Sequence, residues 1–259
     1  QAGQPRALPA LLLATVVFQG LLGMWTVTLL VKPFIVTTHL FGGLATASLL
    51  WLLYLRTHRL SIESSAGPSA WPGVAPKPIS GRLIAVTLGG LLVLLLQIFL
   101  GGWTSTNYVA LHCWDIPTCQ GQWFPPTDFK EGFTLWSPGL DPDAPPLNNS
   151  EINYEGGRLS LEAGTAVHLT HRLGALVTLL VVGGLAIKLF LLGTKVSRRF
   201  SLLLTVTLGS QILLGLLNII LVLPISIAVA HNGGAAILLL ALVTINRKIT
   251  ITEQVTKQV

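Results

Sequence analysis

Two stretches that repeat each other decide the fold: QGLLGMWTVTLLVKPFIVTTHLFGG at residues 19–43 and QILLGLLNIILVLPISIAVAHNGG at residues 211–234. In both, a Gln-x3-Gly phrase is followed by a proline and, 20 residues after the glutamine, by a histidine. Both stretches lie in long apolar runs, where a buried ionisable side chain is costly and usually lines a site. A duplicated pair of apolar helices with one histidine each is typical of a scaffold for a metal or a haem.

The composition is that of an integral membrane protein. Charged residues make up 10% of the 259 residues, where soluble proteins carry about a quarter, and hydrophobic residues make up 51%. Several apolar runs exceed the roughly 20 residues that a helix needs to cross a bilayer. The sequence predicts an all-α, polytopic transmembrane helix bundle with six helices, at residues 10–31, 34–55, 83–105, 165–192, 201–222 and 226–246.

The distribution of charge predicts the topology. Eight of the ten acidic residues lie between positions 105 and 164, and most basic residues lie in the connector 57–82 with its flanks, in the loop 194–200 and in the tail 247–259. Short basic loops stay in the cytoplasm, so we expect both termini there and the loop 106–164 on the outer side. The net charge of +6 therefore reflects topology, and a nucleic-acid partner is excluded. Lys32-Pro33 and Leu223-Pro224 are predicted to form tight outer turns, because proline suits the start of a helix.

Three histidines are expected at a common depth. His39 and His171 lie about 9 Å, and His231 about 10 Å, below the predicted starts of their helices at 1.5 Å per residue. His168 and His171 are three residues apart and share a helix face. The alternative is that each imidazole only hydrogen-bonds a neighbouring helix.

The residue types favour a haem among metal-containing groups. The six predicted helices carry no Asp or Glu, which argues against a di-iron carboxylate site, and zinc would normally recruit Cys or carboxylate as well. Imidazoles paired from facing helices suit a six-coordinate haem. Arg172 is a candidate partner for a haem propionate, with a snorkelling interfacial arginine as the alternative.

Cys113 and Cys119 are the two cysteines of the chain, and the predicted topology places both outside. Oxidation is favoured there, so a disulfide that closes a small loop is expected. It would be structural, or it would exchange electrons with a thiol partner. A zinc site formed with His112 is the weaker alternative.

Phrases along nearly the whole chain resemble the haem A synthase family, membrane enzymes that convert haem O to haem A, in its proteobacterial form. They are residues 19–27, 33–43, 101–108, 119–123, 153–157 and the His168-Leu169-Thr170-His171-Arg172 run. The resemblance implies two four-helix halves, each offering a histidine pair. On this pattern, residues 1–56 are the last two helices of the N-terminal, substrate half, and 83–246 the C-terminal half.

The resemblance assigns roles residue by residue. His171 and His231 fall on the pair that holds haem b, with His168 and Arg172 beside them, and His39 falls on the side where substrate haem O binds. Cys113 and Cys119 match an outer cysteine pair. The family's first two helices, with a Glu-x-x-His-Arg motif, have no counterpart, so His39 lacks its partner and the expected catalytic glutamate is missing. The chain starts with Gln, and we interpret the sequence as a fragment.

The leading hypothesis is a haem A synthase-like oxidoreductase of the bacterial inner membrane that oxidises a methyl group of haem O to a formyl group. Its implied partners are a haem O donor (haem O synthase), cytochrome oxidase assembly factors, an unidentified electron donor and membrane lipid, with a homo-oligomer left open. The alternative is an electron-transfer membrane cytochrome b. A thiol oxidoreductase that uses Cys113 and Cys119 is a third hypothesis, and the lack of carboxylates in the helices argues against a proton-coupled transporter.

Overall fold

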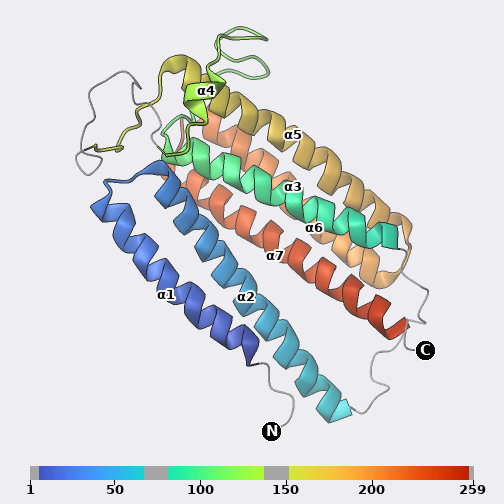
Figure 1. The fold of residues 1–259 in the computed structure, drawn as a ribbon. Coiled ribbons are helices and arrows are strands. Elements are labelled where there is room, and N and C mark those ends of the chain that lie inside the picture. The colour runs from blue at the N-terminus through green and yellow to red at the C-terminus, as the bar shows by residue number, and fades with distance from the viewer. Residues whose placement is uncertain (1–5, 67–80, 137–151, 257–259) are drawn as a thin grey trace.

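A computed structural model describes residues 6–66, 81–136 and 152–256. Within these described ranges, six long helices and one short helix follow one another (Figure 1). Each long helix contains a segment long and apolar enough to cross a membrane, which confirms the predicted all-α transmembrane class. The helices are α1 (Ala7–Thr28), α2 (Pro33–Ala66), α3 (Gly81–Thr106), α4 (Phe129–Gly132), α5 (Leu161–Leu191), α6 (Lys195–Ile220) and α7 (Ile225–Thr256).

Four of the helices form a closed ring, and the other two form a hairpin attached to it. In the ring, α3 packs against α5, α5 against α6, α6 against α7, and α7 against α3. The diagonal pairs α5–α7 and α3–α6 are not in backbone contact. The hairpin docks through α2, which contacts both α3 and α7, whereas α1 contacts α2 alone among the described elements. Figure 1 shows α1 and α2 at one side of the bundle.

The buried core lies inside the ring, in its inner part. Aliphatic side chains from all four ring helices pack together there, among them Leu94, Val182, Leu204 and Leu242, each at most 3% exposed. Since lipid covers the outside of the bundle, this internal packing, rather than water exclusion alone, holds the helices in register.

The hairpin turns α1–α2 and α6–α7 have the same backbone geometry. Each contains two consecutive residues with positive φ, Leu30 and Val31 in the first and Val222 and Leu223 in the second. In each turn an N–H reaches back five residues, from Val31 to Thr26 O at 2.8 Å and from Leu223 to Asn218 O at 2.7 Å. The two predicted tight turns are confirmed.

Several predicted helix ends are wrong because helices continue beyond their apolar segments. The first turn of α6 holds the basic residues expected in the loop 194–200, since α6 begins at Lys195 with Thr194 as its cap. Similarly, α2 runs to Ala66 and α7 to Thr256, into the predicted connector and tail. Lys and Arg are good helix formers, so a helix can continue through charged residues after its apolar segment has ended. Hydropathy alone therefore places the helix end too early. The prolines of the connector lie outside the described residues, as does 137–151 of the outer loop.

Candidate functional site

His39 of α2 packs against a glycine of α1. A methyl group added at Gly23 would lie 3.4 Å from His39 Cε1, so the imidazole rests over the bare backbone of α1. One turn further along this antiparallel pair, Gln19 Nε2 donates a hydrogen bond to the main-chain oxygen of His39 at 2.9 Å. The Gln19 side chain lies where a Cβ at Gly42 would be. Two large polar side chains therefore fit against two glycines across the same interface.

His171 of α5 makes the same contacts with α3. A Cβ at Gly101 would lie 3.0 Å from His171 Cε1. Gln97 Nε2 donates to His171 O at 3.1 Å and lies 3.1 Å from His171 Nδ1. The amide oxygen of Gln97 occupies the position that a Cβ at Gly174 would take.

His231 of α7 repeats the arrangement with α6. A Cβ at Gly215 would lie 3.4 Å from His231 Cε1, and the Gln211 amide lies against Gly234. We call each set of four residues a histidine unit: a glutamine and a glycine four residues later on the first helix, and a histidine and a glycine three residues later on the second. The units are Gln19–Gly23 with His39–Gly42, Gln97–Gly101 with His171–Gly174, and Gln211–Gly215 with His231–Gly234.

His171 and His231 belong to α5 and α7, which lie diagonally across the ring without backbone contact. Each imidazole rests on a glycine of a neighbouring ring helix, Gly101 of α3 for His171 and Gly215 of α6 for His231. Buried residues on α5 stop at His168 and resume at Thr178, and the first buried residue of α7 is Leu238. Packing is therefore looser at the histidine level than in the core below it. His39 lies in the hairpin, where its imidazole packs on Gly23 of α1.

The chemistry of these donors fits a haem. Nδ1 of His39 and of His231 is enclosed and lacks a hydrogen-bond partner in the described structure. Iron-ligating histidines usually turn one ring nitrogen toward the protein and offer the other to the metal. No three His, Cys, Asp or Glu side chains of the described residues gather into a metal site. Two imidazoles on diagonal helices of an apolar bundle suit a porphyrin iron, which brings four ligands of its own.

His168 and Arg172, predicted beside the haem, contact the outer loop. His168 is 3% exposed, and its Nδ1 accepts a hydrogen bond from the Cys113 N–H at 3.1 Å. Arg172 donates to the main-chain oxygens of Asp115 and Thr118 at 2.9 Å and of Cys113 at 2.5 Å. Its Nε is enclosed and without a partner, so one donor of the guanidinium is left for an anionic group such as a propionate.

The disulfide prediction is confirmed. Cys113 and Cys119 are bonded to each other, which excludes the zinc alternative with His112. The His112 imidazole instead lies against Gly164 of α5, and burial lowers the pKa of His112. The disulfide loop is closed further by Asp115, whose carboxylate accepts from the Thr118 hydroxyl and from the N–H groups of Gln120 and Gly121.

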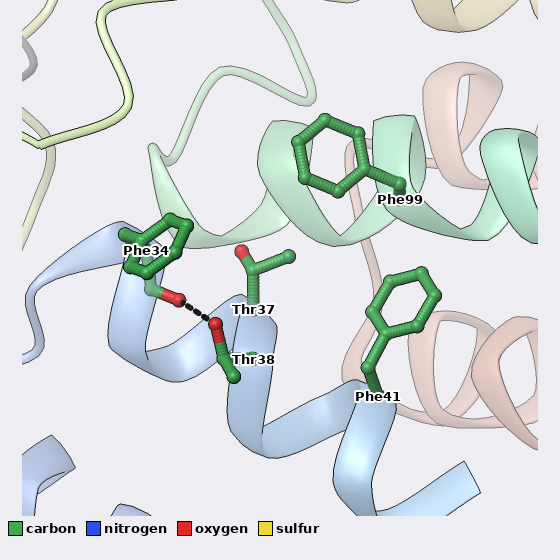
Figure 2. Close-up of a pocket in the computed structure, with 5 residues that line it drawn as sticks. All are labelled: Phe34, Thr37, Thr38, Phe41 and Phe99. Atoms are coloured by element: carbon green, nitrogen blue, oxygen red, sulfur yellow. Dashed lines mark hydrogen bonds between the residues drawn. The ribbon is translucent and has the colours of Figure 1, made fainter. Parts of the chain in front are cut away.

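A pocket of about 240 Å³ lies between α2 and α3 (Figure 2). Its lining is apolar apart from two hydroxyls, one of which, Thr38 Oγ1, donates to Phe34 O at 2.7 Å. His39 is not in this lining, and by helical periodicity it faces another side of α2. The pocket belongs to the hairpin–ring contact and carries no ionisable group; its residues are Phe34, Thr37, Thr38, Phe41 and Phe99.

Sequence reasoning did not pair Gln97 with His171. The first and third units place glutamine and histidine 20 residues apart, but the outer loop separates this pair by 74 residues. The pairing could have been found from two patterns in the sequence. Each of the three histidines begins a His-x2-Gly pattern, and α3 carries a Gln-x3-Gly phrase like those of the other two units.

The fold and the histidine units define a multi-pass membrane protein with buried imidazoles on paired helices. Residues 1–243 match the family described as cytochrome oxidase assembly protein, and the chain belongs to that family. It is similar to the haem A synthase of Shewanella oneidensis, with 40% identity over 242 residues that make up 93% of this chain. The chain spans 66% of the length of that relative.

Proposed function

We propose that this chain acts in haem A synthesis, as an oxidoreductase that converts the methyl group of haem O into the formyl group of haem A. The observation that carries the proposal is that His171 and His231 stand on diagonal helices of the ring, each packed against a glycine of a neighbouring helix, at a level where α5 has no buried residues. Family membership and the similarity to a haem A synthase support it.

In this proposal, the ring holds haem b through His171 and His231. A haem supplies one-electron chemistry when bound. The chain's own residues bind and orient it: the glycines let each imidazole lie close to the neighbouring helix, and apolar helices exclude water from the reacting methyl group. Arg172 would neutralise a propionate through its free Nε while it holds the outer loop.

The hairpin would offer His39 to substrate haem O. Its unit has the contacts of the other two, which supports a porphyrin ligand rather than a purely structural histidine. We further propose a bacterial inner membrane location with both termini in the cytoplasm and the disulfide loop in the periplasm. Haem O synthase, as the supplier of the substrate, and cytochrome oxidase assembly factors are the proposed partners, and the electron donor is not assigned.

The test is pigment analysis in cells that make haem O. Haems are extracted with and without the chain, and the formyl-bearing haem is separated from haem O by chromatography. We expect haem A to appear with the parent and to be reduced at least tenfold in His39→Ala, because the substrate loses its ligand. Thr46→Val, on the same helix with one intrahelical hydrogen bond lost, is the matched control and should keep the parent level. Folded protein that carries haem b but yields no haem A would favour the electron-transfer cytochrome instead.

A further inference from the structure

Three glutamines lie in membrane-spanning helices without a role in the proposed chemistry. Gln19, Gln97 and Gln211 each stand on the first helix of an antiparallel pair whose second helix carries the histidine. An amide in an apolar span is costly unless it is hydrogen-bonded, so its partner indicates what it is for. In two units the partner is the histidine residue of the same unit, for Gln19 through the main-chain oxygen and for Gln97 through both main chain and ring. In the third unit the Gln211 amide lies against Gly234, and its nitrogen lacks a partner in the described structure.

The bonded carbonyl is the one that belongs to the histidine itself. Within a helix this oxygen already accepts an N–H, and the glutamine uses its second lone pair. The bond therefore fixes the position of the histidine backbone relative to the neighbouring helix. On the same interface the glycine of the first helix sets how closely the ring can approach, with Cβ positions 3.0 to 3.4 Å from Cε1 in all three units. Backbone position and ring approach together fix the direction of the imidazole.

Gln97 also reaches the ring of His171. Iron ligation through Nε2 requires the proton on Nδ1, and Nδ1–H needs an acceptor on the protein side. The Gln97 amide stands at that nitrogen, 3.1 Å away, and its own oxygen is enclosed without a partner. In this orientation the same Nε2 donates to His171 O, whereas a rotated amide would accept from Nδ1–H and give up the bond to the backbone.

The third unit shows the opposite amide orientation. Gln211 turns its nitrogen toward Gly234, whereas Gln19 and Gln97 turn their oxygens toward Gly42 and Gly174. The nitrogen of Gln211 is enclosed and lacks a partner, so rotation of this amide would give the third unit the orientation of the other two. In both Gln97 and Gln211 the unpaired amide atom lies against the glycine that stands three residues after the histidine.

We infer that Gln97 and Gln211, with Gly101 and Gly215, are positioning residues that set the direction of the haem-ligating imidazoles, and that Gln19 with Gly23 does the same for His39. This inference rests on the proposed haem function. None of the six touches the reacting group, so each acts through its histidine.

The first experiment uses the full chain purified with haem b. Gln97→Met keeps the volume of the side chain and removes both hydrogen bonds. We expect haemin to bind about tenfold to a hundredfold more weakly, the low-spin electron paramagnetic resonance signal to shift, and the midpoint potential to rise because the imidazole becomes a weaker donor. Thr87→Val is the control: it is fully buried on the same helix and loses one hydrogen bond away from the unit. Unchanged affinity, signal and potential in Gln97→Met would overturn the inference.

The second experiment tests the glycines without removing any polar group. Gly101→Ala places a methyl 3.0 Å from His171 Cε1, whereas Gly89→Ala, on the same helix, meets nothing within 4 Å. We expect a shifted low-spin signal in Gly101→Ala, a smaller one in Gly215→Ala, where the spacing is 3.4 Å, and the parent signal in Gly89→Ala. Equal spectra for Gly101→Ala and Gly89→Ala would also overturn the inference, and this comparison decides if Gln97→Met does not fold.

A His171→Ala variant distinguishes failure of the positioning role from failure of the proposed haem function. If it loses bound haem while Gln97→Met and Gly101→Ala match the parent, the positioning role alone is wrong. If His171→Ala keeps the parent spectrum, the proposed haem function fails, and the inference fails with it.

Discussion

At the residue scale, Arg172 makes contacts that an interfacial arginine does not usually make. An arginine near the end of a spanning helix usually extends its charge to the interface. Here the guanidinium instead donates to three main-chain oxygens of the disulfide loop, one turn from His168, which binds the same loop. Arg172, which holds the loop, is therefore the chain neighbour of the proposed haem ligand His171 on α5. A change in the loop is therefore expected to reach the haem level through this helix.

Arg172→Lys should loosen the disulfide loop. A lysine ammonium is a single point donor and cannot bond three carbonyls in the fixed fork of a guanidinium. We expect the Cys113–Cys119 disulfide to be reduced several-fold faster by a phosphine reductant, followed by thiol labelling. Arg158→Lys is the control, because Arg158 is exposed and bonds one carbonyl outside this loop. Equal reduction rates in the two variants would show that Arg172 does not hold the loop.

The loop should also open in acid. The Thr118 hydroxyl, followed by the N–H groups of Gly121 and Gln120, holds the pKa of Asp115 below its ordinary value of 3.8. A carboxyl with a depressed pKa stabilises the folded loop above the unfolded pKa, about 4, and this contribution is lost as pH falls through the lower folded value. Relative to Asp115→Asn, the parent disulfide should resist reduction at pH 5 to 7 and lose that advantage below about pH 4. A parent-to-variant ratio that does not change with pH would contradict this.

At the element scale, α4 joins the outer ends of α3 and α5. Trp103 Nε1 donates to Gly132 O at 2.8 Å, and the Glu131 carboxylate accepts from Ser160 N at 2.9 Å and from Ser160 Oγ at 2.6 Å. Ser160 is itself the N-cap of α5, with its Oγ accepting from Ala163 N. The four-residue helix α4 therefore fixes the start of α5, the helix that carries His168, His171 and Arg172.

Glu131→Ala should fray the start of α5. The variant removes two charge-assisted hydrogen bonds, each contributing about 1.5 to 3 kcal/mol when formed to a charged group. We expect faster amide hydrogen exchange at residues 161–165 and a lower unfolding temperature in detergent. Glu155→Ala, an exposed carboxylate of the same loop region, is the control. Unaltered exchange in Glu131→Ala would mean that α4 does not support α5.

The sequence predicted the six spanning helices because hydropathy is a local signal. The role of the three histidines stays a prediction, based on a motif that repeats in the sequence. Sequence reasoning missed α4 because four residues leave no periodic pattern, and their position depends on Trp103 and Ser160, far away in the sequence. It also missed the pairing of Gln97 with His171, since an inserted loop hides the spacing that revealed the other two units. Helix ends beyond the apolar segments were set by caps such as Thr194, whose signal is one residue long.

At the scale of the whole molecule, a few polar contacts attach the hairpin to the ring. Trp51 Nε1 donates to Thr244 Oγ1 at 2.7 Å, Thr37 and Thr106 hydroxyls lie 3.2 Å apart, and Tyr154 N donates to Leu30 O at 3.0 Å. Two of these contacts are made by α2, and the third is made by the turn between α1 and α2. The proposed substrate side and the proposed haem b side are thus separate packing units joined along one helix.

Thr244→Val should weaken this attachment. It removes the acceptor of the half-buried Trp51 N–H, and interhelical hydrogen bonds in membranes contribute about 0.6 kcal/mol on average. We expect a small fall in unfolding temperature and faster proteolysis between the hairpin and the ring. Thr207→Val on α6 is the control, because its hydroxyl bonds only within its own helix. Identical behaviour of the two variants would show that the Trp51 contact does not couple the parts.

The central claim, that imidazoles from diagonal helices hold one porphyrin iron, is tested most directly by the spectrum of haem b in the purified chain. The parent should show a low-spin signal of two axial histidines, and His171→Ala and His231→Ala should each lose it, whereas His112→Gln, a loop histidine, should keep it. A parent-like signal in either ligand variant would contradict the account.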